Sequence, residues 1–71
     1  MEKDWMMVYS TIDRFNAMYV KGILEKNNIL VILFEKTENP VTDDMQRGVQ
    51  ELYVHWQQAE EALDFIYNLP E

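Results

Sequence analysis

The longest apolar run of the chain is Ile29-Leu30-Val31-Ile32-Leu33-Phe34, and this run decides the class of fold. Six residues rich in β-branched side chains are too few for a helix of ordinary length, but they suit a strand. The polar pair Asn27-Asn28 precedes the run, and Glu35 follows it. Because the run does not alternate with polar residues, it predicts a strand over residues 29–35 that is covered on both faces.

Four further elements are predicted around this strand. Residues 5–10 are aromatic and β-branched, and residues 48–54 alternate in polarity, so each segment predicts a strand. Residues 12–26 and 57–68 carry apolar side chains at helical spacing. Residues 36–47 are polar and contain Pro40, which predicts a loop that is long for so small a domain.

The two helices are expected to bury their apolar stripes. We expect Thr11 to cap the first helix, Asp13 to add favourable charge in its first turn, and Asn27-Asn28 to end it. Two neighbouring stripes predict an unusually wide buried arc on this helix: Ala17, Val20 and Leu24, then Phe15, Tyr19 and Ile23. The second helix is expected to bury Ala59, Ala62, Leu63 and Ile66.

The order β-α-β-β-α limits the topology of the single domain, residues 1–71. A right-handed crossover makes the first two strands parallel, and the third strand can return antiparallel between them. The prediction is an α+β, ferredoxin-like split β-α-β-β-α fold without its final strand, with a three-stranded mixed sheet and two helices on one face.

This topology leaves the second face of the sheet without cover and the first strand as an edge. Strict alternation would place Trp5, Met7 and Tyr9 on one face of the first strand and Met6 and Val8 on the other. Since the sheet carries apolar side chains on both faces, we expect a second subunit to cover the open face, by sheet stacking or by edge pairing.

The charge of the chain is unevenly distributed. The net charge is −7: residues 1–36 hold five acidic and five basic side chains, whereas residues 37–71 hold eight acidic side chains and one basic. Nucleic-acid backbones and anionic membranes are bound by clustered Lys and Arg, so the sequence argues against both partners. No segment resembles a signal peptide or a membrane span, which predicts a cytoplasmic protein.

Five apolar or aromatic residues are the candidate partner-binding residues: Trp5, Met7, Tyr9, Tyr53 and Trp56. Tryptophan is over-represented where binding energy concentrates, although packing in the core is the more ordinary role of these side chains. Aromatic side chains on an open sheet can also stack on bases, but the acidic balance of the chain disfavours that use.

Catalytic, metal and cofactor sites are not predicted. His55 is the only histidine of the chain. A catalytic histidine needs an oriented partner and a nucleophile nearby, so we expect His55 to be a turn residue or a helix-start contact instead. The chain has no cysteine, so further ligands for zinc are missing. The loop acids Glu38, Asp43 and Asp44 lack the spacing of a calcium loop, and a solvated loop is favoured. Two glycines, Gly22 and Gly48, cannot build a phosphate-binding loop.

The chain resembles a family of small bacterial domains of unknown function that carry the label of prokaryotic signal-transducing proteins. The resemblance rests on Trp5 with the Val-Tyr-Ser-Thr segment 8–11, on Ala17, on the segment 20–25, on Asn27-Asn28-Ile29, and on the segments 51–54 and 59–63. It implies a ferredoxin-like fold of the kind seen in PII-type nitrogen-signalling proteins. It implies no established activity, cofactor or catalytic residue.

The sequence thus favours a non-enzymatic interaction or signal-transducing domain that self-associates through its sheet as a homodimer or other homo-oligomer. The alternative is a small-molecule sensor with a ligand site at the subunit cleft or under the 36–47 loop. An enzyme is the least favoured interpretation, because no catalytic group has an evident partner.

Overall fold

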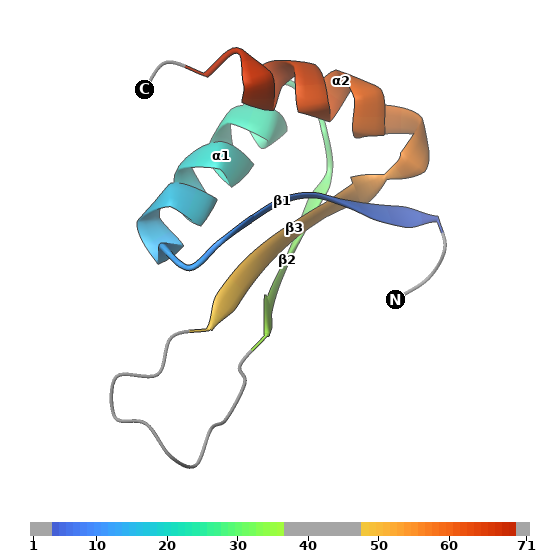
Figure 1. Ribbon diagram of the computed structural model, residues 1–71. Helices are drawn as coiled ribbons and strands as arrows, with labels where there is room; N and C mark the ends of the chain where they lie inside the picture. The colour runs from blue at the N-terminus through green and yellow to red at the C-terminus, as the bar shows by residue number, and fades with distance from the viewer. Residues whose placement is uncertain (1–3, 37–47, 70–71) are drawn as a thin grey trace.

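The computed structural model describes residues 4–36 and 48–69, which fold into three strands and two helices (Figure 1). The elements are β1 (Trp5–Thr11), α1 (Arg14–Lys26), β2 (Val31–Lys36), β3 (Val49–His55) and α2 (Trp56–Tyr67). The predicted α+β class and element order are confirmed, and every bound lies within two residues of its expected place. Of the predicted loop 36–47, Lys36 belongs to β2, and residues 37–47 lie outside the described residues.

The three strands form one sheet in the order β1-β3-β2. The central position that was predicted for the third strand is confirmed. Both neighbouring pairs are antiparallel, so the prediction of a mixed sheet is wrong. The strands β1 and β2 do run in the same direction, but they form no parallel ladder because β3 lies between them.

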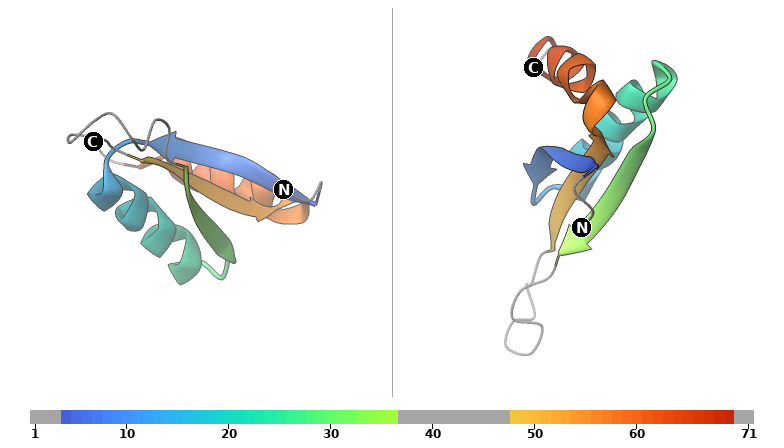
Figure 2. Two further views of the ribbon diagram at one scale, coloured as in Figure 1. Left: turned by 90° about the horizontal axis from the view of Figure 1, so that it is seen from below. Right: turned by 90° about the vertical axis from the view of Figure 1, so that its right-hand side faces the viewer.

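Both helices pack on the same face of this sheet (Figure 2). On β3 the buried residues alternate with half-buried ones, so that Gln50, Leu52 and Val54 point toward the helices. The predicted half-buried character of this strand is confirmed. The remaining apolar core residues come from both helices, from β2 and from the turn before it: Ala17, Val20, Leu24, Ile29, Val31, Ala59 and Ala62.

The start of α1 differs from the prediction. Asp13, not Thr11, is the N-cap: its side chain accepts hydrogen bonds from the backbone N–H groups of Phe15 at 3.0 Å and Asn16 at 3.3 Å. Thr11 instead accepts a hydrogen bond from the Asp13 N–H at 3.1 Å, within the turn that leads into the helix. A carboxylate at the N-cap also meets the positive end of the helix dipole, so the later start is favourable.

The predicted end of α1 is confirmed. Asn27 is the C-cap, and Asn28 has a φ of 67°, the left-handed conformation that Asn tolerates better than most residues. The Ile29 N–H then donates to the Leu24 carbonyl at 3.0 Å. The turn directs Ile29 into the core, where it is fully buried.

Only one of the two apolar stripes of α1 is buried. Ala17, Val20 and Leu24 face the sheet as predicted, but in the second stripe only Ile23 is half-buried, whereas Phe15 is 86% exposed and Tyr19 is 50% exposed. The prediction of a wide buried arc is therefore wrong. A single helix contacts the sheet along one stripe, and the Phe15 and Tyr19 side chains lie outside this stripe.

A β-bulge in β1 overturns the predicted alternation of that strand. Met7 pairs with Tyr53, but Tyr9 pairs with Leu52, so the register shifts at Val8. Tyr9 therefore lies on the helix face instead of sharing a face with Trp5 and Met7. One extra residue reverses the side-chain direction of everything that follows it in a strand.

The start of α2 gives His55 a structural role. The backbone N–H of Gln57 donates to His55 Nδ1 at 3.2 Å, which makes His55 the N-cap of the helix. The prediction of a helix-start contact is confirmed. Of the four residues predicted to be buried on α2, Ala59 and Ala62 are buried, whereas Leu63 and Ile66 are half-buried.

Candidate functional site

The face of the sheet that points away from both helices is the candidate functional site, called the open face below. The cross-strand register assigns its side chains to three strands: Trp5, Met7 and Ser10 of β1, Val49, Glu51, Tyr53 and His55 of β3, and Ile32, Phe34 and Lys36 of β2. The core that the two helices form with the sheet lies on the opposite face, and Trp56 at the start of α2 contacts His55 at one end of the open face.

Apolar side chains dominate the middle of the open face. Met7, Tyr53 and Ile32 are direct cross-strand neighbours and form a row across all three strands. Met7 is 50% exposed, Ile32 is 38% exposed, and Phe34 beside them is 49% exposed. Large apolar groups on adjacent strands normally lie in a core or an interface, because their burial is favourable.

A shallow hollow of about 380 Å³ lies at the β2 side of the open face, lined by Phe34, Lys36, Glu51 and Tyr53. The Tyr53 hydroxyl donates a hydrogen bond to Glu51 Oε1 at 3.0 Å. This hydrogen bond, together with some burial and the negative charge of Glu51, raises the pKa of Tyr53 above its ordinary value. The hollow thus combines two aromatic rings with one carboxylate and one ammonium group.

The other end of the open face is closed by aromatic contacts. The Trp5 ring lies edge-on to the His55 ring, with the ring centroids 5.9 Å apart and an interplanar angle of 81°. The Trp56 ring is tilted by 31° against the His55 ring, and their centroids also lie 5.9 Å apart. The His55 ring is therefore close to two tryptophan rings while its Nδ1 caps α2. This arrangement gives His55 a role in packing and in capping α2.

The five predicted partner-binding residues do not all lie together. Trp5, Met7 and Tyr53 share the open face, whereas the bulge places Tyr9 on the helix face. Trp56 begins α2 and is 53% exposed. The prediction did not include Ile32, Phe34, Lys36 and Glu51, which also lie on the open face. Alternation along β2 could have shown that Ile32 and Phe34 share one face, but the run is apolar throughout and carries no sign of which face is open.

The described residues contain no further arrangement of known chemistry. Within residues 4–36 and 48–69, no group of three or more His, Asp or Glu side chains lies close enough together to hold a metal ion. Neither described helix has the length and apolar character needed to cross a membrane. The ion pairs Arg14–Glu35 at 3.4 Å and Lys21–Glu25 at 2.9 Å lie away from the open face.

Comparisons with known proteins do not identify the chain. No family model matches it, and no curated protein or solved structure matches it. The exposed apolar row and the hollow of the open face are therefore the features of the structure that point to a function.

Proposed function

We propose that the chain is a non-enzymatic interaction domain that self-associates by stacking the open faces of two copies. The observation that carries this proposal is the exposed row of Met7, Tyr53 and Ile32 with Phe34 beside it. Removing apolar surface from water contributes roughly 25 cal/mol per Å², so stacking two such faces is favourable. Two stacked sheets lie about 10 Å apart with interdigitated side chains, as in a β-sandwich.

The charges of the open face favour a second copy as its occupant. The chain as a whole has a net charge of −7, whereas the open face holds one acid, Glu51, and one base, Lys36. Two copies can therefore meet at their open faces without the electrostatic repulsion that would arise between two acidic surfaces. In a two-fold symmetric pair, Lys36 of each copy can lie near Glu51 of the other, since such an interface is self-complementary.

Features of both edge strands favour stacking of the sheets over edge pairing. The bulge at Val8 interrupts the regular ladder of β1, and bulges are a common means of preventing one edge strand from pairing with another. The other edge, β2, ends in the charged residues Glu35 and Lys36. Charged residues on an edge strand have the same protective effect.

The ferredoxin-like arrangement and the relationship to the small bacterial signal-transducing domains belong to the same proposal. The element order, with β3 between β1 and β2 and both helices on one face, supports that arrangement. A shared fold carries no activity with it, so the signalling role is proposed as regulation through assembly and not as catalysis.

The test is sedimentation velocity of two matched variants, each of which replaces an exposed phenylalanine by lysine. Phe34→Lys places a charge in the proposed interface, and Phe15→Lys places the same charge on the outer side of α1. We expect Phe34→Lys to weaken self-association at least about tenfold, because stacking would then lose the apolar Phe34 contact and would remove an additional charge from water. Phe15→Lys is expected to associate like the unmodified protein.

Two outcomes would contradict the proposal. If Phe15→Lys dissociates the assembly and Phe34→Lys does not, the interface lies on α1. If both variants associate as the unmodified protein does, the open face takes no part. Far-UV circular dichroism of both variants verifies that the fold is kept, which is expected because both side chains are exposed in the single chain.

A further inference from the structure

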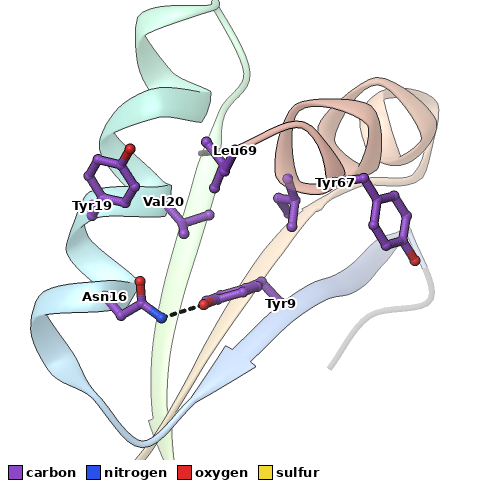
Figure 3. A pocket seen from close by; sticks show the side chains of 7 residues that line it. Tyr9, Asn16, Tyr19, Val20, Tyr67 and Leu69 are labelled. Atoms are coloured by element: carbon purple, nitrogen blue, oxygen red, sulfur yellow. Dashed lines mark hydrogen bonds between the residues drawn. The ribbon is translucent and has the colours of Figure 1, made fainter. Parts of the chain in front are cut away.

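A hollow on the helix side of the molecule, called the helix cleft below, lies between α1 and α2 (Figure 3). It has a volume of about 450 Å³ and is open on one side. Seven residues line it: Tyr9, Asn16, Tyr19, Val20, Ile66, Tyr67 and Leu69. Its volume falls in the range of small-molecule sites, which is roughly 300–1,000 Å³.

Two neutral polar groups meet in the helix cleft. The Asn16 side-chain N–H donates to the Tyr9 hydroxyl oxygen at 2.5 Å, and both side chains are partly buried. The Asn16 amide oxygen points away from Tyr9 (Figure 3), and no hydrogen bond within the described chain engages either this oxygen or the Tyr9 hydroxyl proton. The cleft thus offers one acceptor, Asn16 Oδ1, and one donor, the Tyr9 O–H, on neighbouring side chains.

The β-bulge is the reason that this pair exists. Without the register shift at Val8, Tyr9 would point to the open face and its hydroxyl could not reach Asn16 on α1. Bulges often redirect one side chain toward a site. The walls around the pair are apolar, with Val20 from α1 and Ile66 from α2, while Tyr19 and Tyr67 lie at the rims, 50% and 81% exposed.

We infer that the helix cleft binds a small, neutral, planar molecule that carries an amide group or an equivalent adjacent donor and acceptor. The ligand N–H would donate to Asn16 Oδ1, and its carbonyl oxygen would accept from the Tyr9 hydroxyl. The planar body would lie against the apolar walls that Val20 and Ile66 form. An anion is disfavoured because no charged side chain lines the cleft and the chain as a whole is acidic.

The test compares two ligands of the same ring and size, nicotinamide and its anionic analogue nicotinate, by NMR titration of ¹⁵N-labelled protein. Nicotinamide is expected to cause saturable shifts of the Asn16 side-chain amide and of the backbone amides of Val20 and Leu69. Nicotinate is expected to bind at least about tenfold more weakly, because its charge would lose water without gaining a partner.

The matched variants are Tyr9→Phe and Tyr53→Phe, which each remove one tyrosine hydroxyl from opposite faces of the sheet. Tyr9→Phe should weaken nicotinamide binding by roughly three- to tenfold, the effect of one lost hydrogen bond, and Tyr53→Phe should leave it unchanged. The inference is overturned if nicotinamide causes no saturable shifts at the cleft, if nicotinate binds equally well, or if the two variants behave alike. None of these results depends on self-association through the open face.

Discussion

At the scale of single residues, Gly22 lies in the middle of α1 with open space where a side chain would stand. A Cβ atom added there would meet nothing within 4 Å, and the backbone of Gly22 is not in the left-handed region. The glycine therefore has no packing role in the single chain, and it lowers the stability of the helix by its backbone freedom.

We predict that Gly22→Ala raises the free energy of unfolding by about 0.5–1 kcal/mol. Urea denaturation followed by circular dichroism measures this change. A lower free energy of unfolding in the variant would show that the Gly22 position has a close neighbour, and it would contradict the description of α1 given above.

Tyr53 and Glu51 provide a second prediction at the residue scale. The hydrogen bond to Glu51 is the largest cause of the raised pKa of Tyr53. A raised pKa means that the folded state holds the phenolic proton more tightly than the unfolded state. The stabilising contribution is therefore present below the ordinary value of about 10 and is lost as the pH rises through the folded pKa.

Glu51→Gln removes the carboxylate and is expected to lower the pKa of Tyr53 toward the value of free tyrosine. NMR of ¹³C-labelled tyrosine resolves Tyr53 from the other three tyrosines across the titration. Glu35→Gln is the control, since Glu35 pairs with Gln50 and so lies on the helix face. An unchanged pKa of Tyr53 in Glu51→Gln would contradict the assigned cause.

At the scale of elements, the first turn of α1 depends on Asp13. Its carboxylate satisfies two backbone N–H groups that have no partner within the helix. Asp13→Ala is expected to lower the free energy of unfolding by about 1 kcal/mol, whereas Asp13→Asn keeps the capping oxygen and should retain most of the stability. Urea denaturation of both variants measures the difference, and equal losses would indicate that charge and not capping is the contribution of Asp13.

The elements also show which parts of the fold can be predicted from the sequence. The order of strands and helices follows from apolar periodicity, and the core stripe Ala17, Val20 and Leu24 follows from helical spacing. The exposure of Phe15 could not be predicted in this way, because periodicity identifies an apolar side chain but does not give the width of the surface available to cover it.

Only part of the candidate site could be predicted from the sequence, because alternation along a strand gives the correct face only where the strand is regular. Trp5, Met7 and Tyr53 could be placed on one face because alternation holds over those residues. Tyr9 could not, since the bulge at Val8 is fixed by the pairing of β1 with β3, which is a contact between segments far apart in the sequence. The helix cleft was missed for the same cause, because it requires Tyr9 to face α1.

At the scale of the whole molecule, the two faces of the sheet differ in how far their apolar side chains are exposed to solvent. One face buries Leu52 and Val54 completely against the two helices. The opposite face leaves Met7, Ile32 and Phe34 in contact with solvent on adjacent strands. A sheet with apolar side chains on both faces is expected to be covered on both. The proposed self-association would provide the missing cover without a second kind of chain.

The measurement that tests self-association most directly is the molar mass of the unmodified protein, determined by light scattering after size exclusion over a range of concentrations. We predict a mass of two or more chains that falls toward that of one chain only on dilution. The mass of a single chain at every concentration would contradict self-association, and it would leave the open face as a surface for a different partner.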